Sequence, residues 1–395
     1  MNLRGDFPFL GANPGLVYLD SACTSLKPAQ VIDAEASYYR ELAACGGRSS
    51  HAFGRKTSER TEGAREKVAA FVGADASGLI WTRNTTEGLN IVARGLDYSK
   101  RNKVVTSVME HHAVLLPLMN LEKKGIIRLE MVRAAHDGTV GADAWAGAVD
   151  RDTALVITNN GSNTTGWRGN AREAAKIAHD NGALICVDGA QGVPHGKTDF
   201  RRDGFDFLCF SGHKMLGPTG IGALVARKEL LGRLEPLMSG GGTVKTVRGR
   251  EIEHLTDQTR FEAGVQHYSG MLGLAAACDY LKRIGMDRVE AHERSLAAAL
   301  RRELEAAGAT VYGPDDSSHS ALYSFNLAGA KPHDVALMLD KHGIAVRSGF
   351  FCAQPAMEAL GAKAGAVRAS CYVYNTAEDV EKLGETLVKV KGLYA

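Results

Sequence analysis

Between residues 79 and 225, short apolar runs of strand length alternate with amphipathic segments of helix length. The clearest unit is a strand over Ala154–Thr158, a helix over Ala171–Asn181 and a second strand over Leu184–Val187. This alternation is typical of a parallel sheet covered by helices, because each parallel connection must cross back over the sheet. We therefore predict an α/β fold whose larger part contains a mainly parallel sheet.

The alternation continues in shorter units toward the C-terminus. Strands are predicted at Leu322–Leu327, Ala345–Arg347 and Val367–Cys371, with helical segments between them. A chain of 395 residues has room for more than one domain at roughly 100–200 residues each. We predict a large domain over residues 21–265 and a smaller C-terminal α/β domain over residues 266–395, with residues 1–20 as an N-terminal segment that packs against the small domain.

Composition excludes several classes of protein. The 47 basic and 45 acidic residues leave a net charge of +2, which argues against binding nucleic acid through a large basic field. Asp6, Pro8 and Pro14 interrupt the region where a signal peptide needs an apolar core, and no apolar run approaches the ~20 residues of a membrane span. The seven cysteines form no C-x-x-C pair, so we expect reduced thiols. We predict a soluble cytoplasmic protein without nucleic-acid or membrane partners.

Two stretches imitate binding motifs but lack the required spacing. Gly192–Thr198 resembles a phosphate-binding loop, yet it has one residue too few between its glycines, and Pro194 removes one amide donor. Glu110, His111 and His112 offer metal-binding atoms, but adjacent side chains on a strand point to opposite faces. We therefore predict neither a nucleotide-binding loop nor a metal site.

Polar residues follow two of the predicted strands of the large sheet. Asp188 comes directly after Leu184–Val187, and Lys214 follows the strand Phe207–Phe210. Open α/β sheets bind ligands at the carboxyl ends of their strands. A lysine there can form a Schiff base with an aldehyde cofactor, and a nearby carboxylate keeps a pyridine nitrogen protonated. This pair predicts pyridoxal phosphate as the cofactor.

The sequence also offers groups for the phosphate and the ring of that cofactor. Thr85 and Thr86 precede a helix predicted over Glu87–Arg94, and they supply hydroxyls beside free amides. His111 follows another strand and offers a flat ring for stacking. Each residue alone also has a simpler interpretation: Asp188 as a helix cap, the threonines as N-caps and His111 as an ordinary loop histidine.

Taken together, these residues resemble the class V aminotransferases of fold type I, and within them the cysteine desulfurases of the sulfur-mobilisation type. The resemblance extends over nearly the whole chain, from Tyr18 to Thr376. It is carried by the motifs Thr85-Thr86-Glu87-Gly88, Glu110-His111-His112-Ala113, Asp188-Gly189-Ala190-Gln191, Ser211-Gly212-His213-Lys214, Gly217-Pro218-Thr219-Gly220, Arg260-Phe261-Glu262-Ala263-Gly264 and Gly343-Ile344-Ala345-Val346-Arg347.

The resemblance implies a role for each matching residue. Lys214 would form the Schiff base and Asp188 would pair with the pyridinium nitrogen. The other cofactor contacts would come from Thr85, Thr86, His111, Asn163, Gln191, Ser211 and His213. The substrate would be bound by Arg368, Asn163, His51 and Arg347, and the catalytic residues would be Lys214, His111 and Cys352.

It further implies a reaction and an assembly. L-cysteine would be converted to L-alanine, with sulfur held as a persulfide on Cys352 and passed to an acceptor protein or thiol, for example in iron–sulfur cluster assembly. His111 is expected to carry protons, because the ordinary pKa of histidine lies near neutral pH. The enzyme would be a homodimer in which Gly241, Gly242 and Val265 of one subunit lie near the site of the other.

Two positions depart from the family pattern and leave alternatives open. Phe350 and Phe351 precede Cys352 where a histidine pair is common, and apolar flanks disfavour the reactive thiolate. Val265 stands where a threonine usually offers a hydroxyl to the phosphate. The alternatives are a cysteine or cystine C–S lyase, a selenocysteine lyase or an amino-acid epimerase with the same cofactor. A non-enzymatic binding protein that uses the basic loop Lys245–Arg250 is a further hypothesis.

Overall fold

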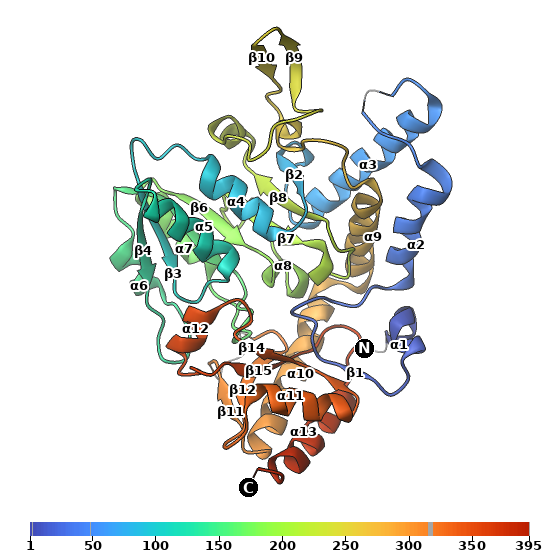
Figure 1. Ribbon diagram of the computed structural model, residues 1–395, viewed down its shortest axis with the longest axis vertical. Helices are drawn as coiled ribbons and strands as arrows, with labels where there is room; N and C mark the ends of the chain where they lie inside the picture. The colour runs from blue at the N-terminus through green and yellow to red at the C-terminus, as the bar shows by residue number, and fades with distance from the viewer. Residues whose placement is uncertain (2, 48, 315–318, 395) are drawn as a thin grey trace.

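The computed structural model describes residues 1, 3–47, 49–314 and 319–394. Its larger sheet has seven strands in the order β2-β8-β7-β6-β5-β3-β4, and β8 alone runs opposite to the other six (Figure 1). The strands are β2 (Leu79–Thr82), β3 (Lys103–Ser107), β4 (Arg128–Val132), β5 (Thr153–Asn159), β6 (Leu184–Asp188), β7 (Phe207–Ser211) and β8 (Gly222–Ala226). The predicted mainly parallel sheet is confirmed.

Helices cover both faces of this sheet because its strands are apolar on both sides. Val104 of β3 packs into the cluster that includes α4 and α5, whereas the next residue, Val105, packs into the cluster that includes α7 and α9. The helices are α2 (Ala29–Ser37), α3 (Ala52–Phe71), α4 (Thr85–Gly95), α5 (His112–Lys123), α6 (Ala142–Ala148), α7 (Ala171–Asp180), α8 (Gly192–His195) and α9 (Tyr268–Ile284). Among the described residues, no helix has both the length and the apolar character that a membrane crossing requires.

A smaller antiparallel sheet lies below the large one in Figure 1, with the strand order β11-β12-β15-β14. This part consists of α10 (Met286–Ala306), β11 (Thr310–Tyr312), β12 (Leu322–Asn326), α11 (Pro332–Lys341), β14 (Arg347–Gly349), α12 (Gln354–Ala359), β15 (Ala366–Ser370) and α13 (Ala377–Lys391). The single strand expected at Ala345–Arg347 is wrong. The chain forms two short strands there, because β13 (Ile344–Ala345) pairs with β1 (Val17–Tyr18) and β14 pairs with β15.

The predicted division of the chain at residue 265 stays a prediction. Within the range expected for the small domain, α9 packs against α2 and α3 beside the large sheet (Figure 1). The N-terminal segment also reaches the smaller part, where α1 (Pro8–Ala12) leads into β1 and Arg4 pairs with Asp379 at 2.9 Å. The polypeptide thus crosses between the two parts more than once, and the functional site lies where they meet.

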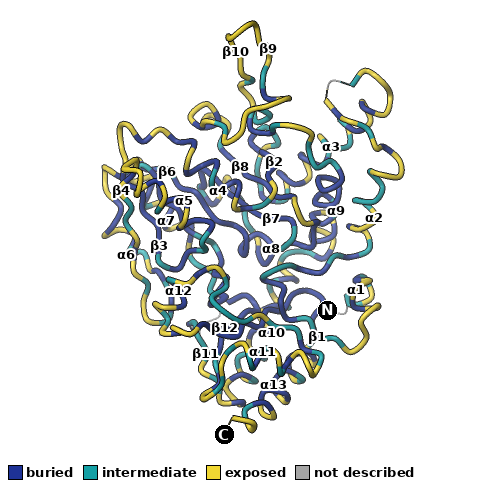
Figure 2. Tube along the Cα trace, viewed as in Figure 1, coloured by how far each residue is buried: buried dark blue, intermediate teal, exposed yellow. Residues whose placement is uncertain are grey.

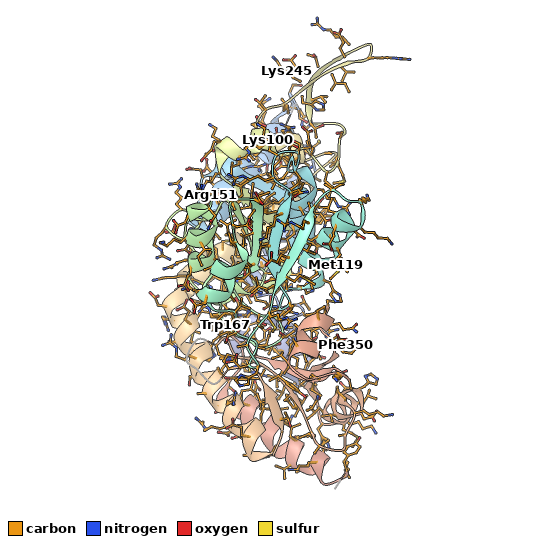
Figure 3. The ribbon with its side chains drawn as sticks, turned by 90° about the vertical axis from the view of Figure 1, so that its left-hand side faces the viewer. Lys100, Met119, Arg151, Trp167, Lys245 and Phe350 are labelled. Carbon is orange, nitrogen blue, oxygen red and sulfur yellow. The ribbon has the colours of Figure 1, made fainter. Side chains whose placement is uncertain are left out.

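A two-stranded hairpin, β9 (Val244–Arg248) and β10 (Glu251–His254), projects from the large part. Figure 1 shows it at the top of the molecule, Figure 2 colours almost all of it as exposed, and Figure 3 labels Lys245 on it. Both Val247 and Ile252 expose more than half of their surface there. The basic loop singled out in the sequence is therefore part of this projecting hairpin.

Candidate active site

A cavity of about 260 Å³ lies at the carboxyl ends of the parallel strands, beside the small sheet. Parallel strands bring their carboxyl ends to one edge of a sheet, so the residues that follow β5, β6 and β7 meet there. All of the residues predicted to bind the cofactor or substrate or to act in catalysis, except His51, line this cavity: Thr85, Thr86, His111, Asn163, Asp188, Gln191, Ser211, His213, Lys214, Arg347, Cys352 and Arg368.

Asp188 and Lys214 face the cavity from neighbouring strand ends. Asp188 closes β6, is buried, and accepts a hydrogen bond from the Ala190 amide at 2.9 Å. Burial raises the pKa of its carboxyl, whereas the Lys214 charge lowers it. Burial likewise lowers the pKa of the Lys214 ammonium, and Asp188 opposes that shift. A lysine whose amine is easily deprotonated is suited to act as a nucleophile toward an aldehyde.

The phosphate end of the predicted cofactor site is formed by the start of α4. The helix begins at Thr85, two residues earlier than predicted, because Asn84 is the N-cap and its side chain accepts from the Glu87 amide at 3.1 Å. The Ser211 hydroxyl reaches from β7 and lies 2.6 Å from the Thr85 hydroxyl. Thr86 lines the cavity with them. Hydroxyls beside the positive end of a helix are suited to bind a phosphate.

His111 is the N-cap of α5, and its Nδ1 accepts from the Ala113 amide at 3.0 Å. Burial lowers its pKa to about 3, and the nearby charge of Lys214 contributes to the shift. The imidazole is therefore neutral at neutral pH, with Nδ1 already used as an acceptor. Burial thus moves this pKa away from the ordinary value on which the expected proton-carrier role was based, and that role stays a prediction. Stacking of the neutral ring stays a prediction.

Two arginines and one carboxylate form the end of the cavity next to the small sheet. Arg347 and Arg368 are register partners on β14 and β15, and both contact Asp20, Arg347 at 2.6 Å and Arg368 at 3.4 Å. Arg368 also donates from Nη1 to the Asn163 carbonyl at 2.9 Å. Its buried Nε has no hydrogen-bond partner among the described residues. Buried donors are normally satisfied, so the free Nε fits a bound acceptor such as a substrate carboxylate.

Cys352 lies on a turn between β14 and α12 and is exposed. Phe351 and Cys352 have φ angles of 55° and 56°, in the left-handed region that L-residues rarely adopt. Two hydrogen bonds hold their carbonyls: Asn163 Nδ2 donates to Phe351 at 2.8 Å, and the His112 amide donates to Cys352 at 2.7 Å. The two phenylalanines are only half-buried and leave the thiol open to solvent.

Three further residues line or shape the cavity and were missed in the sequence. Asp20 bridges the two arginines, and Cys23, interpreted above as one of the ordinary thiols, lines the cavity. Asn159 also lines it and donates to the buried carboxyl of Glu110 at 3.0 Å. Burial raises the pKa of Glu110 to about 7. Asp20 lies two residues after Tyr18, where the resemblance to the family begins, and this was the signal available in the sequence.

The remaining predicted residues lie outside the cavity. His51 is the N-cap of α3, where its Nδ1 accepts from the Gly54 amide at 3.1 Å. Gly241 and Gly242 are exposed near the base of the projecting hairpin, and Val265 exposes 80% of its surface. Within one subunit, these four residues do not join the other predicted site residues.

Comparisons with known proteins identify a family and several relatives. The family described as aminotransferase class-V matches residues 17–383. The chain belongs to this family. The predicted resemblance and fold class are thereby confirmed, and the chain is an enzyme of a family whose members are generally pyridoxal-phosphate-dependent.

Individual relatives are named cysteine desulfurases. A protein of Methanothermobacter thermautotrophicus named "Probable cysteine desulfurase" is 40% identical, over 99% of this chain and 98% of its own length. The apo structure of a cysteine desulfurase from Thermococcus onnurineus has a TM-score of 0.95 at 36% identity, covering 99% of this chain and 97% of that one. The cysteine desulfurase CsdA of Escherichia coli has a TM-score of 0.92 at 33% identity, covering 100% and 98%.

Proposed function

We propose that this enzyme is a pyridoxal-phosphate-dependent cysteine desulfurase that converts L-cysteine to L-alanine and holds the sulfur on Cys352. The observation that carries the proposal is the cavity itself. It places a half-buried lysine, a buried aspartate, an arginine with a free buried donor and an exposed thiol around one space. The cysteine desulfurase names of the relatives support the same reaction.

The residues present fit the cofactor. Asp188 offers a buried carboxylate for the pyridinium nitrogen, and the hydroxyls of Thr85 and Ser211 meet at the start of α4 for the phosphate. His111 offers a neutral flat ring, and Lys214 offers the amine that would bind the aldehyde. When bound, pyridoxal phosphate supplies an electron-withdrawing ring that acidifies the substrate Cα–H and weakens its Cβ–S bond.

The chain's own residues account for the remaining steps. Arg368 holds the substrate carboxylate through its fork of donors, and Asp20 fixes the position of that fork. The Lys214 amine takes the Cα proton, and burial keeps that amine ready to do so. The Cys352 sulfur attacks the substrate sulfur, so the S–S bond forms as the Cβ–S bond breaks. The electron pair of the broken bond stays with the substrate, Cβ gains a proton in place of the sulfur, and Lys214 returns the proton to Cα, which gives alanine.

The assembly and the later sulfur transfer belong to the same proposal. The exposed positions of Gly241, Gly242 and Val265 suit contact with a partner subunit of a homodimer. Cys352 would pass its sulfur to an acceptor protein or thiol, and its exposure permits that approach. All seven cysteines are free, which suits a reducing compartment such as the cytoplasm.

Product analysis tests the proposal directly. Protein loaded with pyridoxal phosphate is incubated with L-cysteine or, in a separate reaction, with L-selenocysteine in the presence of a reducing thiol, and alanine, sulfide, pyruvate, ammonia and D-cysteine are measured. We expect alanine and sulfide in equal amounts. Pyruvate with ammonia would instead identify a C–S lyase, D-cysteine would identify an epimerase, and turnover of selenocysteine alone would identify a selenocysteine lyase. No turnover of any of these substrates would overturn the enzymatic proposal.

A further inference from the structure

The ring of Phe351 packs against the guanidinium of Arg368 inside the cavity. The distance from the Arg368 Cζ to the ring centroid is 4.9 Å, within the range of a cation–π contact. Arg368 is only 3% exposed, so little water screens this contact. The residue proposed to hold the substrate carboxylate therefore touches the residue next to the proposed sulfur acceptor, Cys352.

Asn163 forms hydrogen bonds with both Phe351 and Arg368. Its side chain donates to the Phe351 carbonyl at 2.8 Å, and its own carbonyl accepts from Arg368 Nη1 at 2.9 Å. The three residues come from separate segments of the chain: the loop after β5, the turn after β14, and β15 itself. A shift of any one of them changes the contacts of the other two.

The turn needs such support because it is strained. Two successive non-glycine residues with positive φ cost about 1–3 kcal/mol each, and they persist only where the surroundings hold them. The surroundings here are the Asn163 side chain, the His112 amide and the Arg368 guanidinium. The conformation that presents Cys352 is thus linked to the arginine.

We propose that Phe351 is a positioning residue that holds the Cys352 turn against Arg368, so that binding of the substrate carboxylate and presentation of the thiol are coupled. This inference rests on the proposed function. The Phe351 ring lies against the same guanidinium whose free Nε would bind the carboxylate, so the ring holds that guanidinium in place while the turn is held by the contact. Phe351 itself takes no part in bond making.

Phe350 provides a matched control. Both phenylalanines are half-buried and pack against the small apolar cluster of Met357, Ala362 and Ala366. Phe351 alone of the two lines the cavity. Figure 3 labels Phe350 beside the small part of the molecule. A role limited to apolar packing would be preserved by leucine at either position, whereas contact with the guanidinium needs an aromatic ring at 351.

The test compares Phe351→Leu, Phe351→Tyr and Phe350→Leu with the wild type. The dissociation constant of the product L-alanine is measured from the absorbance change of the holoenzyme, and the KM for L-cysteine is measured separately from kcat. For Phe351→Leu we expect the L-alanine constant and the KM to rise about five- to tenfold, because the ring no longer holds the Arg368 guanidinium in the orientation that binds the carboxylate. Phe351→Tyr should restore near wild-type values, and Phe350→Leu should leave them unchanged.

A second readout does not depend on turnover. The rate of Cys352 alkylation by iodoacetamide is followed by mass spectrometry in the cofactor-free protein. We expect several-fold faster alkylation in Phe351→Leu alone, because the turn is released. Equal values for Phe351→Leu and wild type in both readouts, or equal effects in Phe350→Leu, would overturn the inference. If the wild type makes no alanine from cysteine, the proposed function fails instead, while the alkylation comparison still decides the role of Phe351.

Discussion

The two sides of the cavity are built in different ways. On the large-sheet side, Asp188, Gln191 and Ser211 are buried at or just beyond strand ends, and each makes a hydrogen bond within the chain. On the opposite side, Cys352 is exposed on a turn with two positive φ angles. The buried side suits a cofactor that must be held in one place. The exposed turn suits a sulfur carrier that must reach both the substrate and an acceptor.

We therefore expect substitutions on the two sides of the cavity to have different consequences. Changes on the large-sheet side should abolish binding or chemistry, because the groups there are pre-organised by a rigid sheet. Changes on the turn should leave the cofactor in place and alter the binding of substrate or the transfer of sulfur.

Replacement of Lys214 by alanine should have the largest effect. We expect turnover of L-cysteine to fall to background and the visible absorbance band of the lysine-bound cofactor to disappear, because the amine that binds the aldehyde is gone. Absorbance spectra and alanine assays measure both effects. Lys341→Ala, at the exposed end of α11, is the control and should behave like wild type. A normal spectrum in Lys214→Ala would show that another residue binds the cofactor.

Asp188→Asn should come next, with kcat reduced by about 100-fold or more, because a positioned group that controls a proton contributes on that scale. The amide keeps the shape of the side chain but cannot hold a proton on the pyridine nitrogen by its charge. Asp180→Asn, at the exposed end of α7, is the control. Retention of kcat in Asp188→Asn would contradict the assignment of the large-sheet side.

Glu110 gives a pH-dependent prediction for stability. Its folded pKa of about 7 lies above its ordinary value of 4.5, so the folded protein holds this proton more tightly than the unfolded chain. Between these two values the free energy of unfolding of the wild type therefore falls as pH rises, by up to about 3 kcal/mol. Glu110→Gln removes this contribution, so its stability relative to wild type should increase from pH 4.5 to pH 8.

Urea unfolding at several pH values measures how the difference in free energy of unfolding between Glu110→Gln and the wild type changes with pH. The glutamine can still accept one hydrogen bond from Ser107 or Asn159, which bond the two carboxyl oxygens in the wild type. A constant stability difference across this pH range would mean that Glu110 is ionised in the folded protein throughout. The hydrogen-bonded group of Ser107, Glu110 and Asn159 would then carry a negative charge.

Val265→Thr should have the smallest effect. If Val265 lies near the partner subunit's phosphate site, a new hydroxyl there should tighten binding of pyridoxal phosphate about fivefold, or about 1 kcal/mol. Cofactor titration of the apoprotein measures the change. Val388→Thr on α13, also exposed, is the control. An unchanged affinity in Val265→Thr would place this residue away from the phosphate of either subunit.

The sequence predicted the large-sheet side better than the other side, for a physical reason. Asp188 and Lys214 follow apolar strands, and strand ends in a parallel sheet converge by a general rule. Asp20 and Cys23 could not be placed this way. They reach the cavity because Asp20 bridges to Ser370 of β15, a pairing between distant parts of the chain that local patterns do not reveal. The pKa of His111 was misjudged because burial is not visible in the sequence.

A single turnover with no acceptor thiol present tests most directly whether Cys352 receives the sulfur of L-cysteine. The holoenzyme is mixed with L-cysteine, alanine is quantified per active site, and the extra sulfur atom is located by mass spectrometry of peptides. Cys45→Ala, which removes another exposed cysteine, is the control and should behave like wild type. We predict one equivalent of alanine with the sulfur on Cys352, and no alanine burst in Cys352→Ala. An unchanged alanine burst in Cys352→Ala, or sulfur bound to a different cysteine, would contradict it.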